Sequence, residues 1–230
     1  MTNLLLVGHG RMGQLVEQLA QSHDCRVMGV VTEQSPNDAL ASHDFGTIDV
    51  VVDFSAAAAV KQNLSAIAGR NWNVVIGTTG WQADTAACKA IADKAGIGVF
   101  AAANFSIGMH VFREVVEEAS RRFAGIADVG AWIHESHHSA KKDAPSGTAL
   151  LLKNAMEQAG YARAIDVSST RAGSIPGTHE VGFDAPTETV TLVHEVRDRA
   201  VFAHGALEAA KWLKGRRGWF SMNDMLAKQG

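Results

Sequence analysis

The sequence has 230 residues, of which 47% are hydrophobic, so the chain can bury one sizeable core or two modest cores. Its formal net charge is −3, from 21 basic and 24 acidic residues, without a long run of one sign. This balance argues against an extended binding face for nucleic acid or for an anionic membrane surface.

The cysteines and the N-terminal residues indicate where in the cell the protein is expected. Cys25 and Cys88 have neither metal-binding nor redox spacing, so we expect both to be small core residues in a reducing environment. The first three residues carry no basic signal region, and the apolar run 4–7 is too short for a signal sequence or a membrane span. We therefore expect a soluble, cytoplasmic protein.

The first motif is a glycine-rich turn between a strand and a helix. The apolar run 4–7 is typical of a central strand in a parallel sheet, and a helical pattern at 15–19 follows the turn. A second apolar run leads to Glu33, where a dinucleotide fold places the acid that binds the ribose hydroxyls. This context favours a dinucleotide-binding turn over a strand–turn–helix without a ligand. The residues of the turn are Gly8, His9, Gly10, Arg11, Met12 and Gly13.

The residue that follows Glu33 bears on the choice of cofactor. Gln34 stands where an arginine would help to hold the 2′-phosphate of NADPH. An acid without a neighbouring cation favours NADH, because a 2′-phosphate would bring a like charge to Glu33. Arg11 could reach a phosphate from the glycine turn, so NADPH remains a second possibility.

Strands and helices continue to alternate up to residue 101. We expect a loop or short helix at 34–46, strands at 48–55, 74–76 and 98–101, and helices at 56–70 and 84–95. This order is typical of right-handed βαβ units in a parallel sheet, whose ligands bind at the carboxyl ends of the strands. The segments 77–79 and 102–105 stand at such ends. The alternatives are an ordinary turn at 77–79 and a helix cap at Asn104 or Ser106.

The second half of the chain changes character. We expect helices at 111–123 and 149–160 and strands at 128–133, 165–171, 178–183, 188–194 and 200–202, before a last helix at 202–213. Alternation of apolar and polar residues dominates this region, which indicates a mixed sheet. The sequence therefore predicts an α/β fold, with a Rossmann-type dinucleotide-binding domain and a smaller α+β domain that contains a mixed sheet.

A helix start near residue 146 predicts an anion-binding site. Pro145 cannot continue a preceding helix, and Ser146 and Thr148 are typical caps for the apolar helix that follows. The first N–H groups of a helix are unpaired and carry partial positive charge, and Gly147 has no Cβ that would keep a ligand away. We expect this segment to bind a carboxylate or a phosphate.

Proton donors stand just before this helix start. His137 and His138 are adjacent, and Lys141 follows four residues after the first histidine. An imidazole and an ammonium group beside an anion site are suited to a small dianion that takes up a proton during the reaction. The alternative interpretation is a solvated loop in which the lysines face water and residues 145–148 form only a turn and cap.

Two other classes of function fit parts of the sequence. A metal site could use His134, His137 and His138 with Glu135, but consecutive histidines in a strand point to opposite faces, and we expect no metal. A dinucleotide-sensing regulator would explain the first hundred residues. It would leave the proton donors of the loop at 135–148 without a role.

The pattern Glu135-x-His137-His138-x-x-Lys141-x-Asp143-Ala144-Pro145-Ser146-Gly147-Thr148 resembles the signature of the dihydrodipicolinate reductases, also called 4-hydroxy-tetrahydrodipicolinate reductases. The turn at 10–13, the segments 77–79 and 104–106, and the last helix resemble the corresponding segments of that family. Two departures are visible. The glycine turn is one residue shorter than is usual, and His204 stands where the family usually has an asparagine.

This resemblance implies a reaction and the residues that carry it. The expected reaction is the NAD(P)H-dependent reduction of 4-hydroxy-tetrahydrodipicolinate, through its dehydrated cyclic imine, to tetrahydrodipicolinate in the diaminopimelate route to lysine. His137 and Lys141 are the expected catalytic residues. The small dicarboxylate substrate would be held by His138, Lys141, Ser146, Gly147 and Thr148. Besides the glycine turn and Glu33, the expected cofactor contacts are Gly77, Thr78, Thr79, Ala102, Ala103, Asn104, Phe105 and Arg199.

The resemblance also implies how the chain is organised. The dinucleotide-binding domain would comprise residues 1–104 and 203–230, and the substrate-binding and oligomerisation domain would comprise residues 105–202. In the family, the sheet of the second domain packs against its copies, so a homotetramer is expected here.

Overall fold

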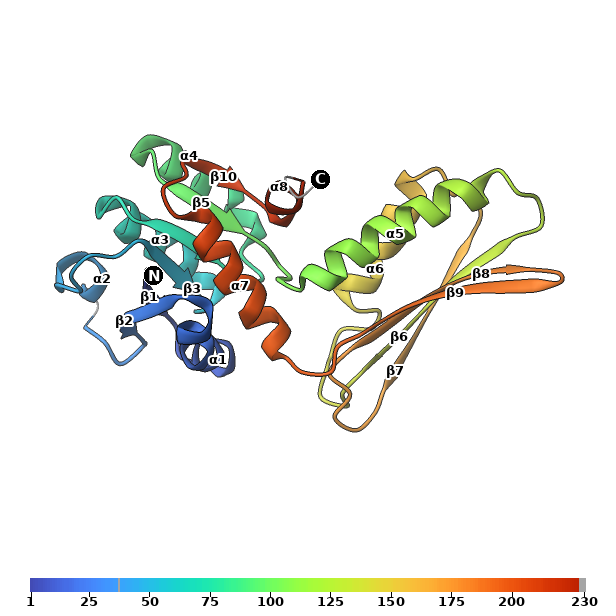
Figure 1. The fold of residues 1–230 in the computed structure, drawn as a ribbon, viewed down its shortest axis with the longest axis horizontal. Coiled ribbons are helices and arrows are strands. Elements are labelled where there is room, and N and C mark those ends of the chain that lie inside the picture. Colours follow the sequence, from blue (N-terminus) through green and yellow to red (C-terminus); the bar gives the residue numbers. More distant parts are fainter. Residues whose placement is uncertain (37, 228–230) are drawn as a thin grey trace. The chain divides into compact units, whose positions relative to one another are not determined.

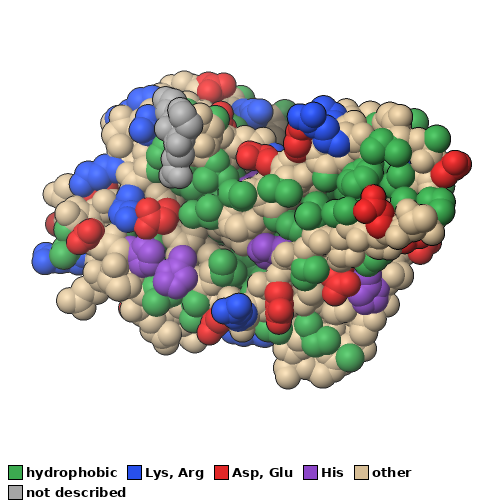
Figure 2. All heavy atoms as spheres, turned by 45° about the vertical axis from the view of Figure 1, so that its right-hand side comes forward, with side chains coloured by type: hydrophobic (Ala, Val, Ile, Leu, Met, Phe, Trp, Pro, Cys, Tyr) green, Lys and Arg blue, Asp and Glu red, His purple; other side chains and the backbone are tan. Residues whose placement is uncertain are grey.

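The computed structural model describes residues 1–36 and 38–227 (Figure 1). The chain divides into two compact units. The first unit comprises Met1–Ser106 and the C-terminal segment from Ala200, and the second comprises Ile107–Arg199. Within the described residues, no helix is long and apolar enough to cross a membrane. On the face drawn in Figure 2, acidic and basic side chains are interspersed.

The first unit is built on a six-stranded parallel sheet with the order β10-β5-β4-β3-β1-β2. Its strands are β1 (Thr2–Val7), β2 (Cys25–Val31), β3 (Val50–Asp53), β4 (Asn73–Ile76), β5 (Gly98–Ala101) and β10 (Gly218–Phe220). The chain turns to one side of β1 to form β2 and to the other side to form β3. Strand order therefore reverses between β1 and β3, which is where Rossmann-type sheets bind their ligands.

Helices cover this sheet because successive side chains of each strand point to opposite faces. Leu5 of β1 belongs to the same core as Leu64 and Ile67 of α3, and α7 packs against the central strands. Cys25 and Cys88 are both buried, as predicted. The helices are α1 (Arg11–Ala20), α2 (Ala39–Ser42), α3 (Val60–Gly69), α4 (Thr85–Ala95), α7 (Ala200–Leu213) and α8 (Met222–Leu226), with short 3₁₀ turns at Gln21–His23, Ala57–Ala59 and Gln82–Asp84.

The second unit contains a four-stranded mixed sheet with the order β7-β6-β8-β9. Its elements are α5 (Ile107–Ala124), β6 (Gly130–His137), α6 (Gly147–Gln158), β7 (Ile165–Arg171), β8 (Thr178–Ala185) and β9 (Glu188–Glu195). Strands β6 and β7 are parallel, whereas β8 is antiparallel to both β6 and β9. Apolar residues of α5 and α6 pack on one face of the sheet with Ile133, Val181 and Phe183. The predicted fold class, including the mixed sheet, is confirmed.

Two local predictions need correction, and one strand was missed. The expected strand at 200–202 is wrong, because these residues form the first turn of α7, whose buried face continues through Ala203, Ala206 and Leu207. A run of three apolar residues fits both the two-residue period of a strand and the 3.6-residue period of a helix. The helix becomes evident only from the spacing of the apolar residues that follow. Strand β6 extends to His137 instead of ending at residue 133, since its polar end is paired with two neighbouring strands. Strand β10 was not predicted, because it has only three residues.

Candidate active site

The glycine turn is tightly packed where it leaves β1. Gly8 has a φ of 89°, and a Cβ on it would lie 2.4 Å from the carbonyl oxygen of Phe54. A Cβ on Gly13 would lie 2.2 Å from the carbonyl oxygen of Gly8, so only glycine fits at either position. A Cβ on Gly10 would meet nothing, and no side chain caps α1. The N-terminus of α1 thus keeps both the space and the free amides that a phosphate requires.

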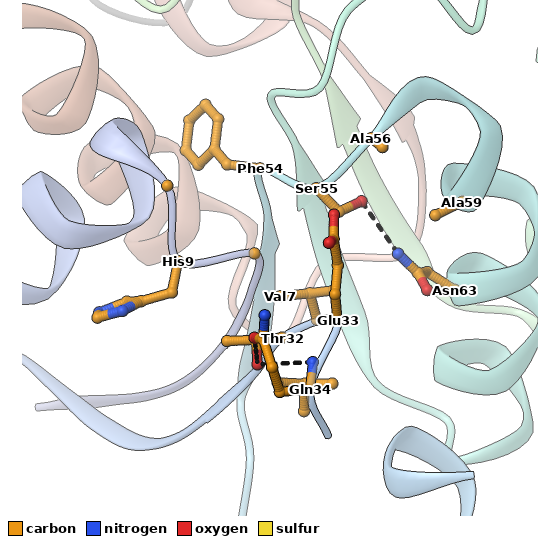
Figure 3. A pocket seen from close by; sticks show the side chains of 13 residues that line it. Val7, His9, Thr32, Glu33, Gln34, Phe54, Ser55, Ala56, Ala59 and Asn63 are labelled. Atoms are coloured by element: carbon orange, nitrogen blue, oxygen red, sulfur yellow. Dashed lines mark hydrogen bonds between the residues drawn. The ribbon is translucent and has the colours of Figure 1, made fainter. Parts of the chain in front are cut away.

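A pocket of about 530 Å³ lies beside this turn, at the carboxyl ends of β1, β2 and β3 (Figure 3). Its position matches the reversal of strand order, and its size suits a small-molecule ligand. The lining residues are Val7, Gly8, His9, Gly10, Val31, Thr32, Glu33, Gln34, Phe54, Ser55, Ala56, Ala59 and Asn63. The glycine cradle and this pocket together fit a nicotinamide dinucleotide.

Glu33 extends along the pocket from the end of β2 (Figure 3). Gln34 is turned back toward Thr32, whose hydroxyl donates a hydrogen bond to its side-chain oxygen at 2.9 Å. His9 is engaged with Glu17 of α1, with 2.7 Å between Nε2 and the carboxylate. Of the described residues that line the pocket, none is lysine or arginine. The carboxylate of Glu33 therefore has no lysine or arginine beside it in the wall of the pocket.

The rest of the predicted glycine turn lies outside the pocket lining. Arg11 is exposed at the start of α1, Met12 is half-buried, and Gly13 is buried against Gly8. Sequence reasoning missed the wall supplied by the segment after β3, which consists of Phe54–Ala56, Ala59 and, in the first turn of α3, Asn63. The available signal was the rule that ligands bind at strand ends, applied to the third strand as well as to the first two.

A buried carboxylate joins this wall to the turn at 77–79. Asp53 is 1% exposed, and its Oδ1 accepts hydrogen bonds from the amide of Ser55 at 2.8 Å and from the hydroxyl of Thr78 at 3.1 Å. Its Oδ2 accepts from the side-chain amide of Asn63 at 3.1 Å. The loops after β3 and β4 are thereby fixed to one side chain, which the sequence analysis did not identify. An acid at the end of the apolar run Val50–Asp53 was the available signal.

The other residues of the first unit that were expected to contact the cofactor differ in how far they are buried. Gly77 lies under the ring of Phe54, where a Cβ would approach within 2.1 Å, and Thr79 is exposed. Thr78 is buried through its contact with Asp53. Ala102 donates its amide to the carbonyl of Ile76 at 3.2 Å, which aligns the end of β5 with that of β4.

Residues 103–105 are the last of the expected cofactor residues in the first unit, and they follow the carboxyl end of β5. Ala103 is exposed, and the side-chain oxygen of Asn104 accepts the amide of Ser106 at 2.8 Å, as a residue that precedes a helix often does. Phe105 is buried and stacks on Phe100 with 5.9 Å between ring centroids. Phe105 therefore presents almost no surface to a ligand in this structure.

In the second unit, the predicted loop begins within a strand and is organised around Glu135. This side chain is 0% exposed, and Arg171 of the neighbouring strand donates to both its oxygens, at 2.6 Å to Oε1 and 3.0 Å to Oε2. The amide of Ser146 donates to Oε1 at 3.1 Å, and His137 Nδ1 contacts Oε2. Burial alone would raise the pKa of Glu135, but Arg171, Ser169 and His137 lower it to about 2. The carboxylate is therefore ionised.

His137 is the last residue of β6 and lies between groups of both charges. Burial lowers the pKa of His137, and Glu135 opposes that effect by stabilising the protonated ring. The ring of His179 stands nearly perpendicular to it, with 5.2 Å between centroids. Sequence reasoning missed His179, because its position opposite Glu135 follows from the pairing of β6 with β8.

The start of α6 is capped as predicted. The hydroxyl of Ser146 accepts the amide of Ala149 at 3.2 Å, and it lies 3.1 Å from Nε2 of His179. Gly147 is exposed, and a Cβ there would meet nothing, so its surroundings are open to a ligand. Thr148 is half-buried in the same turn. Because the backbone and side chain of Ser146 are both engaged, Gly147 and Thr148 present the accessible part of this helix start.

Lys141 lies in the connection between His137 and this helix. Its Nζ contacts both carboxylate oxygens of Asp143, at 2.7 and 2.8 Å, and its amide donates to the carbonyl of His138. His138 is half-buried, and Lys142 is exposed. The structure thus gathers His137, His138, Lys141 and the start of α6 within one unit. Arg199, also expected at the cofactor, is half-buried in the turn before α7.

The residues that could together bind a metal ion differ from the set suggested by the sequence. His134 bonds to Ser168 at 2.9 Å on the opposite face of the sheet, as expected for an alternate strand position. Glu135, His137 and His179 instead place possible ligand atoms within 4.8 Å of one another. The guanidinium of Arg171 lies on both oxygens of Glu135, and this charge opposes a divalent cation at the same carboxylate.

Comparison with known proteins identifies one family along the chain. Residues 2–105 match the family model described as dihydrodipicolinate reductase, N-terminus, and residues 108–226 match the model of its C-terminus. The 4-hydroxy-tetrahydrodipicolinate reductase of Christiangramia forsetii is 34% identical over 98% of each chain. The enzyme of the same name from Caldanaerobacter subterraneus subsp. tengcongensis is 35% identical over 99% of each chain.

The solved structures agree on the fold. A dipicolinate-bound dihydrodipicolinate reductase from Paenisporosarcina sp. TG-14 matches with a TM-score of 0.80 at 20% identity, over 98% of this chain and 99% of that one. A probable dehydrogenase from Thermotoga maritima matches with a TM-score of 0.61 at 10% identity, over 96% of this chain and 92% of that one. With both family models matched and full-length relatives above 30% identity, this chain belongs to the dihydrodipicolinate reductases, a family of NAD(P)H-dependent oxidoreductases.

Proposed function

We propose that this protein reduces 4-hydroxy-tetrahydrodipicolinate, as its dehydrated cyclic imine, to tetrahydrodipicolinate in the diaminopimelate route to lysine. One observation carries the proposal: the second unit places two histidines, a lysine and an open helix start within one short segment. The first unit supplies the glycine cradle and pocket for a nicotinamide dinucleotide. The relatives' names state the same activity for those proteins.

The bound cofactor supplies a hydride from its reduced nicotinamide ring. The first unit holds that cofactor through the amides at the start of α1, the glycines of the turn and the carboxylate of Glu33. Asp53 keeps the loops after β3 and β4 in place around the bound molecule. The turn at 77–79, residues 102–105 and Arg199 are the further cofactor contacts of this proposal.

His137 provides acid–base catalysis in the second unit. Addition of a hydride to a conjugated ring imine leaves negative charge on the ring, which a proton must neutralise. Nδ1 of His137 is tied to Glu135, so Nε2 is the ring atom that exchanges a proton with the substrate. Lys141 is the second proton donor, and its positive charge also attracts a substrate carboxylate.

The carboxylates of the substrate bind at the start of α6. The amides of Gly147 and Thr148 belong to the first turn of α6, where N–H groups lack partners within the helix and suit a negative group. In this structure Asp143 interacts with the amide of Gly147, and a substrate carboxylate would replace it. Ser146 contributes by capping the helix, since its amide is already bound to Glu135. His138 and Lys141 complete the set of groups proposed to hold the dicarboxylate.

NADH is the proposed preferred cofactor. The support is the absence of lysine and arginine from the described wall around Glu33, where a 2′-phosphate would meet an uncompensated carboxylate. Arg11, exposed at the start of α1, is the cation that would have to fold back to accommodate NADPH. The start of α1 has no side-chain cap, so the glycine turn, although one residue shorter than is usual in the family, is compatible with pyrophosphate binding.

A homotetramer formed through the sheet of the second unit is the proposed assembly, in the cytoplasm. The support is the sheet face opposite α5 and α6. Trp132 lies there against Gly182, where a Cβ would come within 2.1 Å of the indole ring, and Val193 is 55% exposed on the same face. Light scattering of the protein and of a Val193→Lys variant tests this assembly, and a parent protein that is monomeric at working concentrations rules it out.

The activity is tested by supplying the unstable substrate in situ. A synthase that condenses pyruvate with aspartate semialdehyde generates the hydroxylated compound in the cuvette, and loss of the reduced-nicotinamide absorbance reports its reduction. The expected result is cofactor oxidation that requires the synthase, both of its substrates and this protein. Oxidation that is independent of the synthase would point to another substrate.

A further inference from the structure

We propose that Glu135 is a positioning residue for the reduction, which holds the ring of His137 with Nδ1–H directed at its own carboxylate and Nε2 free for the substrate. The inference rests on the proposed function, because it takes His137 as a proton donor. Glu135 itself touches neither substrate nor cofactor in this account. It acts only through the orientation and charge of the histidine.

Glu135 is fixed from three directions. Arg171 lies beside His137 in the parallel pairing of β6 with β7, and its two terminal nitrogens reach both carboxylate oxygens. Ser146 donates its amide to the same carboxylate from the start of α6. Ser169, the residue of β7 paired with Glu135, also helps to lower the pKa of this carboxyl. A carboxylate held in this way has little freedom to turn with the ring that it contacts.

The hydrogen-bonding partners decide the tautomer of His137. A carboxylate that accepts from a guanidinium and a backbone amide is ionised, so it can only accept a hydrogen bond. Nδ1 of His137 must therefore carry a hydrogen atom in order to bond to Oε2. In the neutral ring Nε2 is then unprotonated, and in the cationic ring Nε2 holds the transferable proton.

A glycine packs beside Nε2 of the mostly buried His137 ring. A Cβ on Gly177 would lie 3.1 Å from His137 Nε2 and 3.3 Å from the adjacent ring carbon, which is tighter than ordinary contact. Gly177 thus allows a ligand atom to approach without a methyl group beside the nitrogen. The ring of His179 packs edge-on against the ring of His137, and Ser146 holds His179 in place. His179 therefore limits the rotation of the His137 ring.

Four ionisable groups of the second unit act on His137. The negative charge of Glu135 favours the protonated form of His137, whereas the positive charges of Arg171 and Lys141 disfavour it. His179 is coupled to His137 in the same way when it is itself protonated. Loss of the Glu135 charge leaves Arg171 and Lys141 opposing protonation, while His179, with a pKa of about 4, is neutral except in acid. The pKa of His137 then falls, and a reaction that requires the protonated ring loses activity at a lower pH than in the parent enzyme.

The kinetic test is Glu135→Gln, which preserves size and removes the charge. An amide can accept at only one of the two oxygen positions, so one contact with Arg171 is lost in either orientation. The tautomer of His137 changes as well if the amide nitrogen takes the place of Oε2. We expect kcat to fall by about 100-fold, with little change in the dissociation constant of the cofactor. The alkaline limb of the pH profile moves to lower pH. Glu188→Gln, an exposed carboxylate of β9 in the same sheet, is the matched control and keeps parental kinetics.

A spectroscopic test uses the parent protein and does not depend on the folding of the variant. Long-range ¹⁵N–¹H NMR of histidine-labelled protein reads the protonation of each ring nitrogen, and a His137→Gln sample assigns the signals. Above the pKa of His137, the expected pattern is a hydrogen on Nδ1 and none on Nε2. A hydrogen on Nε2 of the neutral ring overturns the proposal.

The outcomes separate this inference from the proposed function. Imine reduction by the parent with unchanged kcat and pH profile in folded Glu135→Gln overturns the positioning role alone. Reduced kcat with an unmoved pH profile and an unchanged tautomer shows a structural role only, which also overturns it. No reduction by the parent overturns the proposed function, while the NMR result still reports on the orientation of His137.

Discussion

The carboxylate of Asp143 lies 2.7 Å and 2.8 Å from the Nζ of Lys141, so the proposed substrate-binding ammonium group is paired with a residue of its own loop. The hydrogen bond from Lys141 lowers the pKa of Asp143, and the amide of Gly147 acts in the same direction. Both donors are groups that we assign to a substrate carboxylate. Asp143 therefore occupies the place that the substrate has to take.

Asp143→Asn is expected to strengthen substrate binding. The ammonium group of Lys141 loses a competing anion, and the pair is exposed enough that its own contribution is at most about 1 kcal/mol. The Michaelis constant for the dicarboxylate should fall by up to about fivefold, and the difference from the parent should shrink at high ionic strength. Steady-state kinetics at two salt concentrations measure both effects. A higher Michaelis constant would mean that Asp143 holds Lys141 in place for the substrate.

His137→Ala and Lys141→Ala should each lower kcat by about 100-fold or more, which is the usual loss when a general acid is removed. Binding of the cofactor is expected to change little, because both residues belong to the second unit. Lys142→Ala, which alters the exposed neighbour of Lys141, is the matched control for charge and location. If both variants turn over at nearly the parental rate, these residues are not the proton donors.

Replacing Glu33 and Gln34, which follow β2, should change the preference between NADH and NADPH. Glu33→Ala combined with Gln34→Arg replaces a lone carboxylate with a cation, which favours a 2′-phosphate over free ribose hydroxyls. The ratio of kcat/KM for NADPH to that for NADH should rise by ~1–3 kcal/mol in free-energy terms. The parent should prefer NADH or show no preference. A ratio that does not move places Glu33 away from the ribose.

Stability should depend on pH through His179. Burial lowers the pKa of His179 to about 4, so the unfolded chain binds its proton at a higher pH than the folded protein does. The stabilisation is complete above the unfolded value near 6.5 and is lost as the pH falls toward 4, by up to roughly 3 kcal/mol. Urea unfolding across this range should show a flatter dependence for His179→Gln than for the parent.

The exposed His43→Gln is the control for that experiment. The corresponding transition of Glu135 lies lower, because its folded pKa of about 2 is below its ordinary value of 4.5, and its contribution is lost between those values. A parent whose unfolding free energy is constant from pH 6.5 to 4 would contradict the assignment to His179.

Local patterns predicted much of this structure correctly. The glycine turn followed from one strand, one helix and an acid at a fixed distance, and the Ser146 cap followed from three residues before an apolar helix. Such features depend on neighbours in sequence. The α/β class and mixed sheet required only the period of the apolar residues and the spacing of the elements.

Contacts between distant segments could not be obtained in this way. Arg171 reaches Glu135 because β7 pairs with β6 in one register, and His179 faces Glu135 because β8 pairs on the other side. A single sequence does not specify either register. The sequence shows Asp53 only as part of a strand, since its three donors come from its own turn, from helix α3 and from the loop after β4. The polar end of β6 was interpreted as a loop for the same reason.

The central claim is that hydride passes from the reduced nicotinamide to the ring of the cyclic imine. It is tested most directly with a cofactor that carries deuterium at both C4 positions, with the imine generated by the synthase and the product examined by mass spectrometry. The claim predicts tetrahydrodipicolinate that contains one deuterium bound to carbon for each cofactor oxidised. Oxidised cofactor without deuterium in the product, or product formed without oxidation of the cofactor, would contradict it.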